Sequence, residues 1–244
     1  MKAAVTRTQT ITKKEKSVLR AENIDMTFDM GAVKVKAIDG ISVDIKKGDY
    51  ISIMGPSGSG KTTLLNIMSA MLRPTSGEVY IENKPMSKMD DNELAKVRGH
   101  TIGFIFQTFN LINRITALEN VMLPLWFQGI PKQEREVIAK QKLEAVGLGD
   151  RIKHRPNELS GGQRQRVAIA RALAVDPSII VADEPTGNLD SKSGEQILEI
   201  IDRLYREEEK TIIMITHENY VAQRAEKTIH LKDGKIINTE YHKH

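Results

Sequence analysis

The apolar residues of this chain fall into short continuous runs in some regions and into helical periodicity in others. Almost unbroken apolar runs, typical of strands buried on both faces, occur at 50–54, 179–182 and 211–216. A helical pattern near 193–206 separates the last two runs, which makes them a β–α–β unit. The pattern predicts an α/β fold with a parallel sheet, and a final hairpin in which an Asp-Gly turn joins 228–231 to 236–238.

The region before residue 85 predicts antiparallel strands. Residues 33–45 alternate apolar and charged positions and end at the turn signal Lys-Lys-Gly-Asp, and 77–81 is another strand candidate. We expect two or three antiparallel strands between residues 21 and 85, interrupted by a glycine-rich loop and the helix after it. From about residue 90 to 160 the pattern becomes helical, which predicts a helical subdomain, and a further amphipathic helix covers 161–174.

Length and composition suit one large domain. We expect a basic, flexible N-terminal tail at 1–20, the folded domain at 21–240 and a short C-terminal tail at 241–244. The chain has no cysteine, which excludes disulfides and thiolate metal sites. It also lacks a long uncharged apolar run and the apolar core of a secretion signal, so we expect a cytosolic chain that does not span the membrane.

The net charge of +4 does not indicate nucleic-acid binding. Residues 1–20 contain six basic residues and one acidic residue, an excess of +5. Subtracting +5 from +4 leaves −1 for residues 21–244, so the basic character belongs to the tail. Such a tail is typical of solvated disorder, or of weak attraction to an anionic inner membrane surface.

A phosphate-binding loop is the strongest chemical signal. The pattern G-x-x-x-x-G-K-[ST] is matched by Gly55, Pro56, Ser57, Gly58, Ser59, Gly60, Lys61, Thr62 and Thr63. A buried strand before it and a helix after it are the context that such a loop requires. Its glycines let backbone N–H groups approach phosphate oxygens, and the helix adds a positive N-terminal dipole. Lys61 suits the outer phosphates and the Thr62 hydroxyl suits Mg²⁺, so the loop predicts ATP and Mg²⁺ as ligands.

Two strand ends supply the remaining groups for hydrolysis. Asp183 and Glu184 follow the 179–182 run, and His217 follows the 211–216 run. Because ligands gather at the carboxyl ends of parallel strands, we expect these side chains near the phosphates. Asp183 would hold Mg²⁺ through water, Glu184 would polarise the attacking water, and His217 would contact the γ-phosphate. A Ser-Gly-Gly sequence at 160–162 opens the next helix and suits either a simple helix cap or a second anion site.

Taken together, these motifs resemble the ATPase subunits of ABC transporters. The quoted elements occur in the family's order across residues 21–240: GPSGSGKTT at 55–63, Gln107, LSGGQ at 159–163, IIVADE at 179–184, Asn188-Leu189-Asp190 and His217. The resemblance implies a P-loop (RecA-like) core with an antiparallel β subdomain and a helical subdomain. It also implies an ATP hydrolase.

The resemblance also implies roles for individual residues. Phe28 is the aromatic residue expected to stack on adenine, and Gln107 is expected to contact Mg²⁺. Asp190 is expected to couple the two ATP sites at the dimer interface. The family implies a homodimer in which one chain's 55–63 loop and the other chain's Ser160, Gly161, Gly162 and Gln163 enclose each ATP.

A finer resemblance concerns the branch of the family. Residues 116–121 and 185–190 resemble the branch that contains lipoprotein-release, macrolide-export, antimicrobial-peptide-resistance and cell-division ATPases. Partners in that branch are integral membrane permeases, which implies a peripheral location at the cytoplasmic face of the membrane. We expect the permease to contact the chain near residues 107–130, where apolar residues are frequent. These residues suit either the core of the helical subdomain or a groove for a short helix of the permease.

A non-transport ABC ATPase is the alternative function. DNA-repair and chromosome-structure members carry a long coiled coil between the phosphate loop and LSGGQ, but here about 100 residues without heptads intervene. Ribosome-associated members usually carry two ATPase domains. A regulatory or mechanical coupler at the membrane, as in the cell-division branch, stays an alternative. Arg164, Arg166 and Arg171 suit a solvated helix face, or contacts to phosphate or to an interface.

Overall fold

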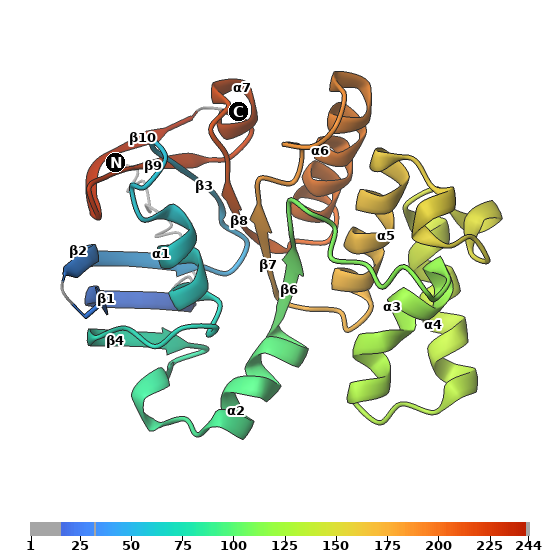
Figure 1. The fold of residues 1–244 in the computed structure, drawn as a ribbon, viewed down its shortest axis with the longest axis horizontal. Helices are drawn as coiled ribbons and strands as arrows, with labels where there is room; N and C mark the ends of the chain where they lie inside the picture. Colours follow the sequence, from blue (N-terminus) through green and yellow to red (C-terminus); the bar gives the residue numbers. More distant parts are fainter. Residues whose placement is uncertain (1–15, 32, 243–244) are drawn as a thin grey trace, which may run out of the picture.

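The computed structural model describes residues 16–31 and 33–242, which form two sheets and a group of helices (Figure 1). The strands are β1 Ser17–Asp29, β2 Lys34–Lys46, β3 Tyr50–Met54, β4 Ser76–Ile81, β5 Lys84–Pro85, β6 Ile102–Ile105, β7 Ile179–Asp183, β8 Thr211–Ile215, β9 Lys227–Lys232 and β10 Lys235–Tyr241. The α-helices are α1 Lys61–Met68, α2 Asp91–Lys96, α3 Ala117–Phe127, α4 Lys132–Ala145, α5 Gly161–Leu173, α6 Ser191–Arg206 and α7 Asn219–Ala222. Short 3-10 turns cover Met86–Lys88, Gly149–Arg151 and Pro156–Glu158, and a π-helical turn covers Val97–Thr101.

The larger sheet has the order β10-β9-β3-β8-β7-β6. All neighbouring strands in it are parallel except the terminal hairpin β9–β10. Alternate residues of β7 face different cores: Ile179 and Val181 pack with β1, β4 and α1, whereas Ile180 and Ala182 pack with α5 and α6. The predicted parallel sheet and the final hairpin are therefore confirmed.

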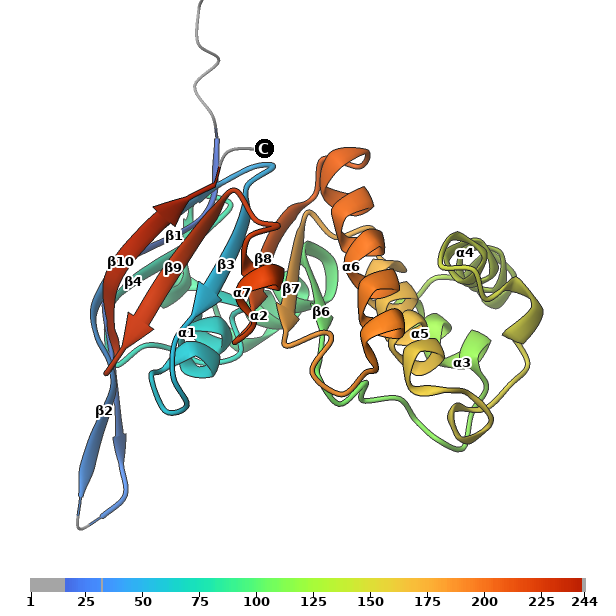
Figure 2. The same ribbon diagram turned by 90° about the horizontal axis from the view of Figure 1, so that it is seen from above.

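The smaller sheet is antiparallel, with the order β2-β1-β4-β5, and α1 lies between it and the larger sheet (Figure 1). Antiparallel strands were expected here, but the described residues give this sheet four rather than two or three, since β5 is only two residues long and β1 begins before residue 21. The pairing of β4 with β1 ends at Asp25 and Ser76, but β1 and β2 remain paired as far as Asp29 and Lys34. The β1–β2 hairpin therefore projects beyond its sheet, as Figure 2 shows.

The helical subdomain begins later than expected. The predicted range 90–160 includes Ile102–Ile105, which forms β6, the edge strand of the larger sheet. Only four residues long, this strand has too few apolar positions to stand out from the helices on either side. The helices α3 and α4 pack on α5, and α3 starts at a capping box in which Thr116 and Glu119 bond reciprocally.

Both predicted tail boundaries fall inside strands. The strand β1 begins at Ser17, and Val18 and Leu19 are 6% and 1% exposed, so the last part of the expected tail is core. Because basic residues flank Val18 and Leu19, the sequence around this apolar pair resembles a charged tail rather than a strand. Residues 1–15, which carry most of the expected tail, lie outside the described residues. At the other end β10 includes Tyr241, and Nε2 of His242 lies 2.8 Å from the hydroxyl of Thr228.

Within residues 16–31 and 33–242, no helix combines the length and the apolar character needed to cross a membrane.

Leu19→Ala tests the position of the N-terminal boundary. Because Leu19 is 1% exposed between β2 and β4, its truncation leaves a cavity and is expected to lower the free energy of unfolding by about 2–5 kcal/mol. The measurement is equilibrium denaturation in urea. Glu22→Ala in the same strand is the control, since its exposed ion pair with Arg20 contributes at most about 1 kcal/mol. Equal, small effects of the two substitutions would place residue 19 in the tail after all.

Candidate ATP site

The phosphate-binding loop joins β3 to α1 and is shaped by close backbone approaches. A Cβ atom at Gly55 would lie 2.2 Å from the carbonyl oxygen of Leu231, and one at Gly60 would lie 2.5 Å from that of Ala37. Gly60 also has a φ of 99° at the start of α1, a conformation that L side chains rarely adopt. Glycine at these two positions therefore lets the loop turn tightly against β2 and β9.

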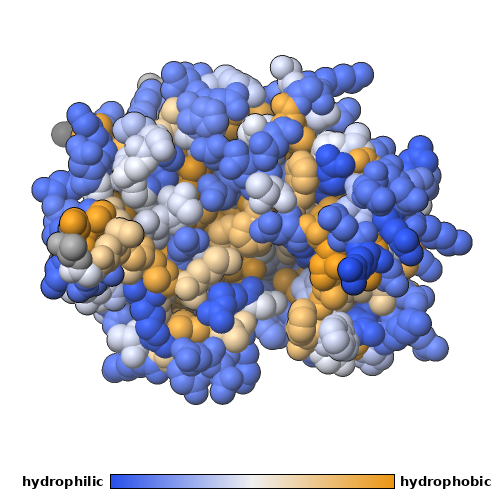
Figure 3. All heavy atoms as spheres, viewed as in Figure 1, coloured by the Kyte–Doolittle hydropathy of each residue, from blue (hydrophilic) through white to orange (hydrophobic). Residues whose placement is uncertain are grey.

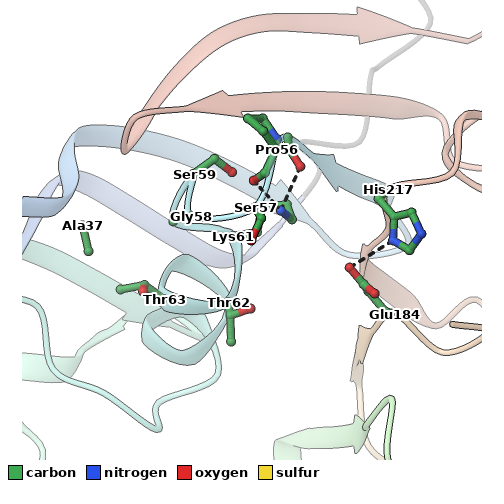
Figure 4. Close-up of a pocket in the computed structure, with 12 residues that line it drawn as sticks. Ala37, Pro56, Ser57, Gly58, Ser59, Lys61, Thr62, Thr63, Glu184 and His217 are labelled. Atoms are coloured by element: carbon green, nitrogen blue, oxygen red, sulfur yellow. Dashed lines mark hydrogen bonds and ion pairs between the residues drawn. The ribbon is translucent and has the colours of Figure 1, made fainter. Parts of the chain in front are cut away.

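Lys61 closes this loop from inside. Its Nζ donates hydrogen bonds to the carbonyl oxygens of Gly55 and Pro56, at 2.8 and 2.9 Å (Figure 4). The ammonium group is thus held at the mouth of the loop, where the N-terminus of α1 adds partial positive charge. Positive charge and backbone N–H groups gathered at one place suit an anionic ligand.

A cavity of about 460 Å³ opens beside the loop. It is lined by Gly55, Pro56, Ser57, Gly58, Ser59, Gly60, Lys61, Thr62, Thr63, Glu184, His217 and Ala37. Glu184 and His217 lie side by side on the wall opposite the loop, with His217 Nδ1 3.2 Å from Glu184 Oε1 (Figure 4). The structure thus brings Glu184 and His217 to the phosphate loop, whereas Asp183, the third predicted strand-end residue, does not line this cavity. Ala37, on β2, also lines the cavity but could not be predicted from the sequence, because a small residue within a strand gives no indication of a binding site until its neighbours in the fold are known.

Gln107 reaches the same carboxylate from the other side. Its Nε2 donates to Glu184 Oε2 at 3.2 Å, and Nδ2 of Asn188 donates to the Gln107 carbonyl at 3.1 Å. A Cβ atom at Gly187 would lie 2.8 Å from Gln107 Nε2, so a side chain there would displace the Gln107 amide from this position. Glu184 itself has a φ of 44°, a strained value for a non-glycine residue and one that structures tend to retain at functional sites.

The carboxyl group of Asp183 fits a magnesium ion. Burial, and next the negative charge of Glu184, raise its pKa above the ordinary value of 3.8, while Lys61 opposes this shift. A desolvated carboxylate beside a second one is stabilised by a hard cation, and Mg²⁺ commonly keeps several waters and uses only one or two carboxylates. The described residues contain no cluster of three acidic, His or Cys side chains, so phosphate and water would supply the remaining oxygens.

The other expected site residues do not line the cavity. Ser160 and Gln163 form a capping box at the start of α5, with bonds of 2.9 and 3.2 Å. Asp190 accepts a hydrogen bond from the Ser193 N–H at the start of α6. Phe28 lies on β1 opposite Val35 and is 39% exposed. None of these residues lines the cavity in this single chain, whose described residues supply the phosphate-loop side.

Comparison with known proteins identifies the family. A family model described as ABC transporter matches residues 38–187. An uncharacterized ABC transporter ATP-binding protein of Thermotoga maritima is 51% identical over 225 residues, covering 92% of this chain and 96% of that protein. The chain belongs to the ABC transporter ATP-binding proteins.

Solved structures extend the likeness to the fold of this ABC ATPase. A dimeric structure of the ATP-binding cassette MJ0796, in a post-hydrolysis state bound to ADP and Pi, has a TM-score of 0.86 and 46% identity, covering 93% of this chain and 99% of that one. The macrolide export ATP-binding/permease protein MacB of Brucella melitensis is 46% identical over 221 residues, which are 91% of this chain and 34% of MacB. This chain is therefore an ATP-binding and ATP-hydrolysing subunit of an ABC transporter, with the P-loop ATPase fold.

The three arginines of the ABC ATPase's α5 are not a solvated face. Arg171 donates to the carbonyl oxygens of Phe109 and Asn110, Arg164 to that of Leu159, and Arg166 to that of Val146. Their partners are backbone carbonyls, and those of Arg171 lie some sixty residues away in the sequence, which periodicity could not reveal. These bonds join α5 to the segment after Gln107 and to the end of α4.

Asp183→Asn is expected to stabilise the chain at neutral pH. Because the folded pKa of Asp183 is raised, stability falls as pH increases from 3.8 through the folded pKa. The variant avoids this loss, so its Tm without Mg²⁺ or nucleotide is expected to exceed that of the wild type at pH 7. The difference should shrink as pH is lowered towards 3.8.

Asp176→Asn is the matched control for that experiment. Its hydrogen bond from Lys210, at 2.7 Å, lowers the pKa of Asp176, so its stabilising contribution is present at neutral pH and is lost on acidification. Thermal unfolding of both variants between pH 4 and 8 should therefore give changes of opposite sign. A lower Tm for Asp183→Asn at pH 7 would contradict the raised pKa of Asp183.

Proposed function

We propose that Glu184 is the general base of ATP hydrolysis and that the chain acts as a homodimer which drives a membrane permease. The observation that carries the proposal is the convergence of Lys61, Glu184 and His217 on one cavity from three adjacent parallel strands. Members of the family and a cassette solved with ADP and Pi support the reaction.

In this mechanism the loop at 55–63 binds the phosphates through its N–H groups, Lys61 and the dipole of α1. Bound Mg²⁺, held by Thr62, Gln107 and Asp183, would neutralise charge on the β- and γ-phosphates. Glu184 accepts a proton from the attacking water. His217 Nδ1 and Gln107 Nε2 contact the two carboxylate oxygens of Glu184, which orients the carboxylate and leaves little freedom for it to turn. Phe28 stacks on the adenine.

The second half of each site comes from a second copy of the chain. Ser160, Gly161, Gly162 and Gln163 begin α5 with N–H groups and a positive dipole, which suits a γ-phosphate bound to the partner. Asp190 begins α6 and couples the two sites across the interface. Dimeric structures of a cassette 46–47% identical to this chain support the arrangement.

The permease is proposed to dock in a groove between β6 and α3. This β6–α3 groove, about 370 Å³ in volume, is lined by Phe104, Phe106, Leu123, Pro124, Phe127, Arg98 and Arg171 together with smaller neighbours. Apolar side chains gather in this region of the face drawn in Figure 3. Phe127 is 80% exposed and Trp126 is 60% exposed, whereas Val121 and Leu125 are buried in the helical subdomain. The buried residues therefore support the core role expected within 107–130, and the exposed ones support the proposed groove for a permease helix.

The β6–α3 groove is connected to Glu184 through two consecutive residues, Phe106 and Gln107. Phe106, which lines it, directly precedes Gln107, and Gln107 bonds Glu184. A movement of the Gln107 segment would therefore shift the wall of the groove, and with it a permease helix bound there. Likeness to MacB supports a role in export, lipoprotein release or force transmission, and docking on a permease would place the chain at the cytoplasmic face of the membrane.

Glu184→Gln tests the base. The amide preserves the size of the side chain but cannot accept a proton, so turnover is expected to fall about a hundredfold or more with ATP binding retained. The variant should accumulate an ATP-dependent dimer in gel filtration, because the closed state is no longer hydrolysed. Near-normal turnover would remove Glu184 from the base role.

Ser160→Arg provides the companion test of the second copy. The bulky cation at the start of α5 should prevent dimer closure, so the ATP-dependent dimer should be lost in a Ser160→Arg, Glu184→Gln double variant. Binding of ATP to the 55–63 loop should be unaffected, as measured by equilibrium titration. Wild-type turnover in Ser160→Arg alone would rule out the shared site.

Phe127→Asp tests the groove. Because Phe127 is 80% exposed, the substitution should not disturb folding or the ATPase rate of the isolated chain. It should abolish co-purification of a multispan membrane protein when the tagged Glu184→Gln chain is isolated from native membranes in mild detergent with ATP and analysed by mass spectrometry. Ile237→Asp on β10, at a residue 63% exposed, is the control and should keep the partner. Equal recovery with both variants would move the docking surface elsewhere.

A further inference from the structure

Gln165 is a buried side chain that bonds two segments of the ATP site. It lies on the second turn of α5 and is 0% exposed. Its Nε2 donates to the carbonyl oxygen of Phe106 at 3.2 Å and to that of Pro185 at 2.8 Å. Phe106 directly precedes Gln107, and Pro185 directly follows Glu184.

The orientation of this amide is imposed by its partners. Both neighbours are carbonyl oxygens, which only accept, so the NH₂ group must face them. The Oε1 atom is then buried and has no hydrogen-bond partner among the described residues. An unsatisfied buried oxygen costs free energy and is rare in native structures. The two hydrogen bonds that the NH₂ group donates to the Phe106 and Pro185 carbonyls offset this cost, which indicates that the position requires a side chain with two donors.

The two bonded segments carry side chains that must meet accurately. Gln107 Nε2 and Glu184 Oε2 are 3.2 Å apart, and a Cβ atom at Gly187 would lie 2.8 Å from Gln107 Nε2 and displace it. The backbone at Glu184 is strained, with a φ of 44°, so it holds this position only while its surroundings constrain it. Arg171 reaches the same loop farther along, at Phe109 and Asn110, but the Gln165 amide bonds both segments at once.

We propose that Gln165 is a positioning residue for hydrolysis: its amide holds the backbone at Phe106 and Pro185 so that Gln107 and Glu184 stay in register. The proposal rests on the role of Glu184 proposed above. Gln165 does not touch ATP; it acts through its two backbone partners. Because Ser160 caps the start of α5, a shift of that helix start would also be passed to both segments through the Gln165 side chain.

Gln165→Met tests the proposal, because methionine keeps most of the volume and removes both donors. We expect kcat for ATP to fall about tenfold or more, while KM and the equilibrium binding of ATP change less than about twofold. Loss of a purely structural bond would not separate kcat from KM in this way. A double-mutant cycle with Gln107→Ala should be strongly non-additive, since both substitutions disturb the same contact.

Arg203→Met is the control. Arg203 also joins two elements through a bond to a backbone carbonyl, that of Ala145 at 2.8 Å, but it lies outside the site. Its kcat should equal that of the wild type after correction for folded fraction. If Gln165→Met and Arg203→Met have the same kcat, the positioning role is wrong.

Gln165→Glu gives an independent readout if the methionine variant does not fold. An ionised carboxylate has no donor and faces two carbonyl oxygens, whereas the protonated form donates one hydrogen bond. The ratio of its kcat to that of the wild type should therefore rise as pH is lowered, and a ratio independent of pH would overturn the proposal. Glu184→Gln with normal turnover would instead refute the proposed base, whatever Gln165 does, so the two failures are distinguishable.

Discussion

The parallel hydrogen bonding of β3, β8 and β7 is the constraint on which the site depends. Ile53 pairs with Ile215, and Ile215 pairs with Asp183, so the three strands end at one level. The phosphate loop, His217 and Glu184 each follow one of these ends, and the Glu184 N–H donates to the Ile215 carbonyl. A slip of one residue in either pairing would move Glu184 or His217 by about 3.3 Å and reverse the faces of its strand.

Two apolar cores hold that register. One core lies between the larger sheet and the antiparallel sheet with α1, and the other lies between the larger sheet and α5, α6 and the helical subdomain. Because each central strand presents alternate residues to different cores, a shifted register would exchange their side chains. The ends of the strands are thus held firmly, whereas the loops beyond them are free to carry polar groups.

Beyond the strand ends, placement depends on polar side chains that reach across the chain. Asn188, Gln165 and Arg171 all bond carbonyl oxygens within residues 106–110, and Gln165 also bonds the segment after Glu184. The crowded glycine at 187 and the strained backbone at Glu184 are tolerated inside this set of bonds. Since the same loop borders the β6–α3 groove, the chemistry and the proposed permease contact share one short segment of backbone.

The sequence by itself determined the α/β class, the parallel strands and the identity of the phosphate loop, because buried strands and phosphate loops have local patterns. It also placed Glu184 and His217, since both directly follow apolar runs. Only the tertiary structure decided that β6 belongs to the sheet and that Val18 and Leu19 are core, because short or charge-flanked apolar segments are ambiguous until they pack. It alone revealed Ala37 and Gln165, whose roles arise from neighbours distant in sequence. A local sequence pattern shows only a residue's neighbours along the chain, whereas these roles depend on the residues that folding places next to it in space.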